Sequence, residues 1–244
     1  MKIFVDTANL KDIEECLRRG FAHGVTTNPS LLAKEPKTSF EAHIGKIIEL
    51  IKIHQPGIHL SVEVFSKNQE EILQQAQRFM QQFGYPQMSV KVHVGWNELE
   101  TIKKLAQLGI SVNCTACMNV SQAIMAARAG AKYVSLFWGR IRDGGNDPEK
   151  TELRNSLKEK KILEENDFDP AQVIKTTRDI FDKSGFTAEI ITGSIRSILD
   201  VKHAHLAGAH IVTIPPKFFP DMMSHFKTDQ VVEQFMKDFG EWLS

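Results

Sequence analysis

The sequence predicts a single parallel (β/α)8 barrel, a TIM barrel, with additional helices at its C-terminal end. Two observations predict it: short apolar runs recur along the chain, and a stretch with the periodicity of an amphipathic helix follows each one. A length of 244 residues suits one such barrel, so we expect a single domain over residues 1–244.

The strands are expected where runs of apolar and β-branched residues have strand length. They are Lys2–Asp6, Gly24–Asn28, His59–Val64, Met88–Val94, Ser111–Ala116, Tyr133–Trp138, Glu189–Ser194 and His210–Ile214. The helices are expected between them, and several end at a glycine a few residues before the next strand. They are Leu10–Arg19, Phe40–Ile53, Gln69–Gln82, Leu99–Leu108, Val120–Ala129, Ala171–Lys183 and Ile198–Ala207.

Two regions exceed what a barrel requires. The gap from Arg140 to Thr187 contains the charged segment Arg142–Asp169, which indicates a loop and an extra helix. After the last strand, Lys217–Ser224 and Gln230–Leu243 have the pattern of two further helices. The last of these is suited to packing on a neighbouring subunit, so we expect a homo-oligomer.

Composition narrows the class of partner. Thirty basic residues balance 30 acidic ones, so no net field recruits nucleic acid or an anionic membrane. No apolar stretch has the length of a membrane span, and the N-terminus lacks the apolar run of a secretory signal, which favours the cytoplasm. We therefore expect small-molecule partners, with anionic groups held by locally placed side chains.

The three cysteines suggest neither a disulfide framework nor a metal site. Cys114 and Cys117 form a Cys-x-x-Cys pair, but no second pair completes a tetrahedral zinc site, and the pair lies at a strand end instead of a helix start. We expect reduced thiols and no metal.

Polar residues stand near the ends of otherwise apolar strands, where a barrel of this type places its chemistry. Singly, each such residue is explained by solvent exposure, but side chains two apart share a face, so together they predict one pocket. They are Asp6, Thr26, Asn28, Glu63, Lys91, Asn113, Thr115, Ser135 and Ser194.

Lys91 is the most informative of these residues, because it interrupts the apolar strand SVKVHV and a lysine is rarely buried without a task. Burial disfavours the ammonium form, and a neutral amine can form a Schiff base with a ketone. The protonated imine then accepts electrons when an adjacent carbon–carbon bond breaks. Asp6 and Glu63, both at strand ends, are the candidates for moving the protons.

The segment GVTTNPSLL (Gly24–Leu32), preceded by VDTAN (Val5–Asn9), has the form and spacing of a known family signature. Through these motifs the chain resembles the small transaldolases and the related fructose-6-phosphate aldolases over nearly its whole length. Val90-Lys91-Val92 is similar to the family's lysine context on the fourth strand.

The resemblance implies a role for each matching residue. Lys91 would form the Schiff base, with Asp6 as acid/base at the carbon–carbon bond, Glu63 as second proton shuttle and Thr115 positioning a water. The substrate-binding residues would be Thr26, Asn28, Asn113, Ser135 and Phe137, with Asn28, Asn113 and Ser135 bonding the dihydroxyacetone portion of the substrate, and Arg140, Ser194 and Arg196 at the phosphate site. No cofactor is implied, because the lysine supplies the electron sink, and the partners would be sugar phosphates.

Some positions depart from the family pattern, namely His93, Leu136 and Trp138. His93 would face the same side as Lys91, either contacting substrate or filling space as a hydrogen-bonded side chain.

Two further positions favour the transferase branch. The aldolases carry Gln on the third strand and Tyr on the sixth, whereas this chain has Glu63 and Phe137. Transaldolase activity, part of the pentose phosphate pathway, is therefore expected. The alternatives are aldol cleavage that releases dihydroxyacetone and a non-catalytic barrel that binds sugar phosphates.

Overall fold

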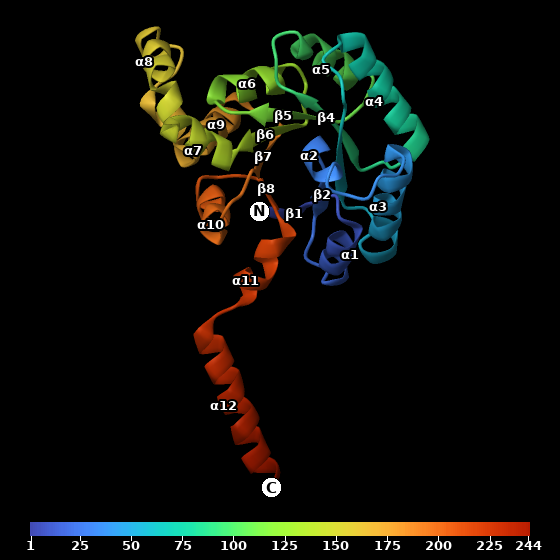
Figure 1. The fold of residues 1–244 in the computed structure, drawn as a ribbon, viewed down its shortest axis with the longest axis vertical. Coiled ribbons are helices and arrows are strands. Elements are labelled where there is room, and N and C mark those ends of the chain that lie inside the picture. Colours follow the sequence, from blue (N-terminus) through green and yellow to red (C-terminus); the bar gives the residue numbers. More distant parts are fainter.

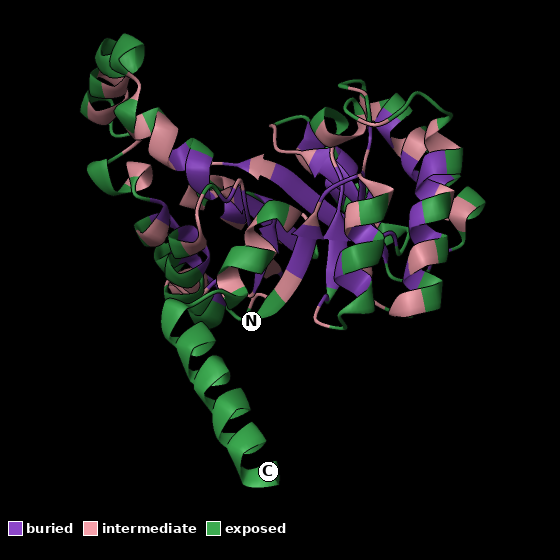
Figure 2. Ribbon diagram, turned by 60° about the horizontal axis from the view of Figure 1, so that its bottom comes forward, coloured by how far each residue is buried: buried purple, intermediate pink, exposed green.

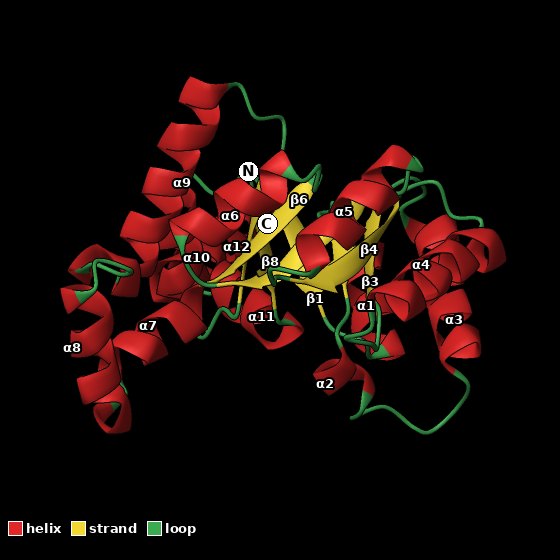
Figure 3. Ribbon diagram, turned by 90° about the horizontal axis from the view of Figure 1, so that it is seen from above, coloured by secondary structure: helices red, strands yellow, loops and turns green.

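The computed structural model describes residues 1–244 and contains a closed barrel of parallel strands in the order β1 to β8. Figure 3 shows the strands enclosed by a ring of helices. The barrel closes where β1 pairs with both β2 and β8, so that Phe4 lies between Gly24 and Thr213. The strands are β1 (Lys2–Asp6), β2 (Gly24–Thr26), β3 (His59–Glu63), β4 (Met88–His93), β5 (Val112–Cys117), β6 (Tyr133–Phe137), β7 (Glu189–Gly193) and β8 (Ile211–Ile214).

The predicted fold class is confirmed, and each expected strand is present with ends that differ by at most two residues. The helices that alternate with the strands also agree to within one residue at each end. They are α1 (Leu10–Arg18), α3 (Phe40–His54), α4 (Gln69–Phe83), α5 (Glu98–Gln107), α6 (Val120–Arg128), α9 (Pro170–Ser184) and α10 (Ile198–Leu206).

Helix α2 (Pro29–Leu32) was not expected from the sequence pattern. It begins because the side chain of Asn28 accepts a hydrogen bond from the backbone N–H of Leu31, and Pro29 occupies the first helical position without losing a needed donor. The cap ends β2 at Thr26, two residues earlier than expected. This short turn places residues 28–30 at the mouth of the barrel.

The expected insertion is present and contains more helix than the pattern indicated. Helix α7 (Trp138–Asn146) starts directly after β6, and α8 (Thr151–Glu159) follows a single 3-10 turn, Pro148–Lys150. A second 3-10 turn, Glu165–Phe168, leads into α9. The insertion therefore begins with a helix that lies beside the barrel mouth, where it can carry site residues.

The core lies mainly between the strands and the surrounding helices, as the buried strands of Figure 2 show. A second, smaller cluster of buried residues fills the barrel interior: Phe4, Tyr133, Ile191 and Ile211. Its members stand near the N-terminal half of their strands, so the apolar filling leaves the carboxyl ends to polar side chains. This arrangement is the usual division of a TIM barrel into a packed floor and a functional mouth.

The chain ends in two helices after β8. A 3-10 turn (Pro216–Phe218) leads into α11 (Phe219–Met223), and α12 (Phe226–Leu243) begins four residues before the expected Gln230. Figure 1 shows α12 projecting away from the barrel, and every residue of it is exposed. No helix of the structure has the length and apolarity to cross a membrane.

Candidate active site

A cavity of about 400 Å³ opens at the carboxyl ends of the strands and is lined by 17 residues. All of the sequence-predicted site residues except Arg196 lie on its wall. Those that line it are Asp6, Thr26, Asn28, Glu63, Lys91, Asn113, Thr115, Ser135, Phe137, Arg140 and Ser194. The strand ends therefore converge on one pocket, as the alternation of side chains predicted.

Strand register brings the central groups together. Glu63 pairs with Lys91 across β3 and β4, and Lys91 pairs with Asn113 across β4 and β5. The Lys91 amine lies 3.0 Å from Glu63 Oε2 and donates to the carbonyl oxygen of Thr27 at 2.8 Å. Its side chain is only 7% exposed. A lysine held in this way presents its nitrogen at a fixed position in a poorly hydrated site.

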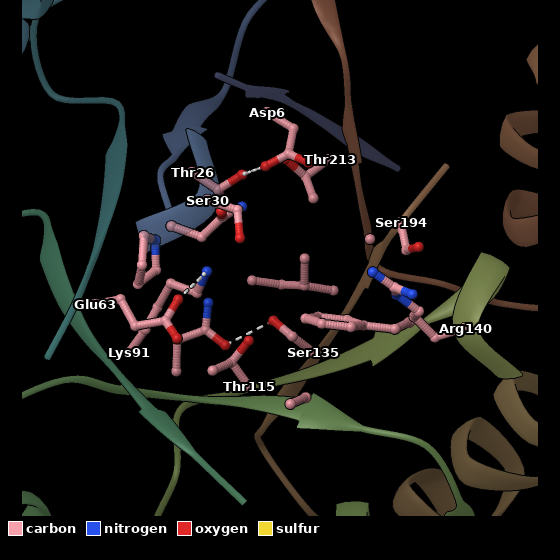
Figure 4. Close-up of a pocket in the computed structure, with 17 residues that line it drawn as sticks. Asp6, Thr26, Ser30, Glu63, Lys91, Thr115, Ser135, Arg140, Ser194 and Thr213 are labelled. Carbon is pink, nitrogen blue, oxygen red and sulfur yellow. Dashed lines mark hydrogen bonds and ion pairs between the residues drawn. The ribbon is translucent and has the colours of Figure 1, made fainter. Parts of the chain in front are cut away.

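Asp6 lies on another side of the cavity, in a short chain of hydroxyl groups (Figure 4). Thr26 Oγ1 donates to Asp6 Oδ1 at 2.8 Å, and its oxygen lies 2.5 Å from Thr213 Oγ1. Because Thr26 has one hydroxyl hydrogen, Thr213 is the donor in the second bond. Burial raises the pKa of Asp6, while the nearby Lys91 charge and the Thr26 hydrogen bond oppose that rise.

Thr115 differs from its neighbours because its buried hydroxyl has no hydrogen-bond partner within the protein. A buried hydroxyl is ordinarily paired, so an unpaired one on the cavity wall is suited to hold a water or a substrate oxygen. The next residue, Ala116, has a positive φ of 62° and also lines the cavity. Backbone conformations that L-residues rarely adopt are more frequent at functional sites, which agrees with the position of Ala116 on the cavity wall.

Asn113 and Ser135 form a hydrogen-bonded pair, with Ser135 Oγ donating to Asn113 Oδ1 at 2.7 Å. Asn113 Nδ2 also donates to Ser61 Oγ, 3.1 Å away, behind the cavity wall. Asn28 uses its side-chain oxygen to cap α2, which leaves its amide N–H groups available. The pocket thus offers several polar groups of defined direction beside the amine.

Arg140 and Ser194 lie across the cavity from Asp6 and Lys91 in Figure 4. Ser194 has a positive φ of 58°, and its carbonyl oxygen packs on Gly139, where an added Cβ would lie 2.6 Å from it. Arg140 forms no ion pair with a carboxylate of the chain. An unpaired guanidinium beside a backbone turn is suited to bind a phosphate.

Arg196 does not line the cavity, although the resemblance grouped it with Arg140. Its guanidinium forms a bidentate ion pair with Asp143, and an added Cβ on Gly139 would lie 2.5 Å from its Nε. These hydrogen bonds hold the pKa of Asp143 below its ordinary value and raise that of Arg196. No sequence pattern predicts this partner, because Asp143 belongs to the inserted helix α7.

The residues that depart from the family pattern lie outside the cavity lining. His93 Nε2 lies 3.2 Å from Glu98 Oε1, so His93 is a paired side chain beside the site. Trp138 is buried, and its indole N–H donates to Asp200 Oδ1 at 3.1 Å. Asp200 Oδ2 also accepts from the backbone N–H of Arg196, so Trp138 helps to fix the loop after β7.

The cavity also contains residues that the sequence argument did not select. Thr213 had a signal, since it is a polar residue in the apolar strand IVTI and shares a face with Ile211. The others are small or apolar, and of these only Pro29 and Ser30 fall in a quoted motif, GVTTNPSLL. They are Pro29, Ser30, Ala116, Ile191 and Gly193.

Comparisons with known proteins identify the family to which the chain is similar. The family described as Transaldolase/Fructose-6-phosphate aldolase matches residues 3–243. A protein of Alkaliphilus metalliredigens named "probable transaldolase" is 36% identical over 239 residues, which cover 98% of each chain. A protein of the same name from Symbiobacterium thermophilum is also 36% identical and covers 98% of this chain and 97% of its own.

Among solved structures, a thiamine phosphate pyrophosphorylase from Pyrococcus furiosus superposes with a TM-score of 0.55. At 10% identity, with 88% of this chain and 85% of the other covered, this likeness supports the barrel fold alone. The family match over residues 3–243 and the 36% identity to the transaldolase relatives are much stronger evidence of relationship than this structural likeness. The chain belongs to the transaldolase/fructose-6-phosphate aldolase family.

Proposed function

We propose that this protein is a transaldolase that transfers a dihydroxyacetone unit from a ketose phosphate to an aldose phosphate. The donor would be fructose 6-phosphate or sedoheptulose 7-phosphate, and the pathway the pentose phosphate pathway. The observation that carries the proposal is the buried Lys91 amine, held 3.0 Å from Glu63 on the wall of a polar cavity. The names of the relatives support the same reaction class.

In the proposed reaction, Glu63 accepts a proton from Lys91, and the neutral amine attacks the ketose carbonyl carbon. Loss of water from the carbinolamine gives the protonated imine, with Glu63 returning a proton to the departing oxygen. Thr115 suits the binding of that water, because its buried hydroxyl has no partner in the chain. No metal or organic cofactor is required, because the imine is the electron sink.

Asp6 would take the proton from the substrate hydroxyl beside the bond that breaks. The electrons of that carbon–carbon bond move into the imine, which becomes an enamine, and an aldose phosphate leaves. The raised pKa of Asp6, caused by burial, suits a group that must accept this proton and later return it. Donation from Thr26 to one carboxylate oxygen, at 2.8 Å, leaves the other oxygen for the substrate.

The remaining predicted residues would hold the substrate. Asn28, Asn113 and Ser135 would bond the dihydroxyacetone portion, while Thr26 orients Asp6. Arg140 and Ser194 would bind the phosphate at the opposite end, with Arg196 joining them if it exchanges Asp143 for phosphate oxygens. The cavity of about 400 Å³ is in the range of small-molecule sites.

The imine assignment is tested by borohydride reduction with fructose 6-phosphate followed by peptide mapping. We expect a dihydroxyacetone adduct on Lys91, and Lys91→Met should lose both the adduct and turnover. Lys103, an exposed lysine with no ion-pair partner, provides the control, since Lys103→Met should keep both. If the protein binds fructose 6-phosphate but forms no borohydride adduct, it is a non-catalytic barrel that binds sugar phosphates.

Transfer is preferred to release because Phe137 presents an apolar ring to the cavity, where a tyrosine hydroxyl could orient water or protonate the enamine. With fructose 6-phosphate alone, we expect little free dihydroxyacetone. Added erythrose 4-phosphate should give sedoheptulose 7-phosphate and glyceraldehyde 3-phosphate rapidly, and Phe137→Tyr should increase release. Equal rates of release and transfer in the unchanged protein would instead identify an aldolase.

We also propose that the protein is a homo-oligomer, because α12 exposes an apolar stripe. An isolated helix of 18 residues is only marginally stable in water, so the stripe needs a covering surface. Light scattering should give a mass above 27.6 kDa, and truncation after Ser224 should reduce it to that of one shortened chain. The stripe contains Val231, Val232, Phe235, Met236, Phe239, Trp242 and Leu243.

A further inference from the structure

A chain of hydrogen bonds passes through the barrel interior and ends at the proposed substrate pocket. It begins at His59 on β3, whose Nε2 lies 2.7 Å from Ser61 Oγ. Ser61 Oγ accepts from Asn113 Nδ2 at 3.1 Å, and Asn113 Oδ1 accepts from Ser135 Oγ at 2.7 Å. Asn113 and Ser135 line the cavity, whereas His59 and Ser61 lie behind its wall.

The direction of these bonds determines the tautomer of His59. Ser135 gives its only hydroxyl hydrogen to Asn113, and Asn113 donates to Ser61. Ser61 must then donate its own hydrogen to an acceptor, and His59 Nε2 is the partner within reach. His59 therefore carries its hydrogen on Nδ1. A hydrogen on Nε2 would donate to Ser61 Oγ and leave the Ser61 hydrogen without this acceptor, unless the Asn113 amide turned and the whole chain reversed.

The surroundings of His59 keep its ring neutral. The imidazole stacks on Phe4 with 5.0 Å between ring centroids and meets the edge of Tyr133 at 4.7 Å. Burial, reinforced by the charges of Lys132 and Lys2, lowers the pKa of His59 to about 3. A protonated imidazole would donate from both nitrogens and could not accept from Ser61. The observed direction thus requires the neutral ring.

We propose that His59 and Ser61 are positioning residues that determine which hydrogen-bonding groups Asn113 and Ser135 present to the substrate. The proposal rests on the transaldolase function given above. With its hydrogen committed to Asn113, Ser135 offers only lone pairs to the pocket, and Asn113 retains one N–H. The matching substrate group must both donate and accept, as a hydroxyl does.

A ketose presents such a hydroxyl on the terminal carbon beside its carbonyl group. A 1-deoxy ketose has a methyl group there and would leave both Ser135 and the Asn113 N–H without partners. Unpaired polar groups in a buried site typically reduce binding by about tenfold to a hundredfold. We therefore expect a preference of this size for fructose 6-phosphate over its 1-deoxy analogue, measured as the ratio of kcat/KM values.

His59→Phe tests the proposal, because it keeps an aromatic ring on Phe4 but removes the acceptor. The ratio should fall about tenfold, whereas His59→Gln, whose amide oxygen can accept from Ser61, should restore most of it. Ile211→Val is the matched control, since it loosens the same interior cluster without touching a hydrogen bond. A purely structural role for His59 would lower stability in both His59→Phe and Ile211→Val and leave the ratio unchanged, which would overturn the proposal.

A second measurement is independent of the reaction. Imidazole ¹⁵N shifts, assigned to His59 by comparison with His59→Gln, should show hydrogen on Nδ1 and a bare Nε2. Hydrogen on Nε2 would overturn the proposal whatever the activity. If borohydride labels Lys91 but His59→Phe keeps the ratio, only this inference fails. If Lys91 takes no label, the proposed transaldolase function fails. The direction of the hydrogen-bond chain from His59 to Ser135 is then tested by the His59 tautomer alone.

Discussion

The two ends of the cavity are built differently. At the amine end, the side chains of Lys91 and Glu63 are 7% and 19% exposed and lie 3.0 Å apart. Beside the proposed phosphate end, just outside the cavity lining, the side chains of Arg196 and Asp143 are 43% and 42% exposed. Buried charges interact without much screening, whereas solvent weakens an exposed ion pair and allows its partners to exchange. The comparison indicates fixed geometry where bonds would form and break, and adjustable contacts where a phosphate would bind.

The largest expected effect is at the buried end. Asp6→Asn should reduce kcat by about a hundredfold or more, because general acid–base catalysis typically contributes that much. An adduct on Lys91 should still form under borohydride, but it should keep all six carbons of fructose 6-phosphate, since Asp6 acts after the imine in the proposed order. Loss of the adduct together with kcat would show that Asp6 is needed to form the imine. Asn113 and Ser135 are hydrogen-bonded to each other, so neither should replace the lost carboxylate of Asp6 as the proton acceptor.

The same substitution should stabilise the fold at neutral pH. Burial raises the pKa of Asp6 above its ordinary 3.8, so the ionised carboxylate costs folding free energy at any pH above the raised value. Asparagine can still accept from Thr26 and carries no charge. We expect Asp6→Asn to raise Tm by a few degrees at pH 7, with the gain shrinking as pH falls through the raised pKa towards 3.8. A gain that is the same at pH 4 and pH 7 would contradict this account.

A smaller effect is expected at the phosphate end. Arg140→Ala should raise KM for fructose 6-phosphate by about tenfold to a hundredfold while changing KM for fructose little, because a remote phosphate contact contributes binding energy. Arg128→Ala is a control, since that guanidinium lies over the Phe186 ring, 4.6 Å from its centroid. Equal losses with both sugars would refute a phosphate contact and weaken the contrast between the two ends.

Sequence patterns predicted the barrel well because each of its strands is a short apolar run between turn signals. They also predicted most of the cavity wall, since a polar residue in such a run is conspicuous, as Lys91 is in SVKVHV. Side-chain alternation then places these residues on the inner face, and the parallel strands end at the same rim.

The features that were missed depend on contacts distant in sequence or on small residues. Helix α2 is too short for periodicity to reveal it, and Gly193 has no side chain to signal a role. The commitment of Arg196 to Asp143 depends on how α7 lies against the loop after β7, which local pattern does not encode. The direction of the bonds from His59 to Ser135 likewise appears only when three strands are placed together.

The smallest expected effect tests whether the exposed end is adjustable. If Asp143 competes with phosphate for Arg196, Asp143→Asn should lower KM for fructose 6-phosphate by about twofold to fivefold, the range that exposed ion pairs contribute. The gain should shrink at high salt, because screening already weakens the pair. Glu152→Gln, an exposed change of equal charge on α8, is the control for a general shift in potential and should leave KM within the error of the measurement. A raised KM in Asp143→Asn would show the opposite arrangement, in which Asp143 holds Arg196 in its binding position, and both ends of the cavity would then be fixed before the substrate arrives.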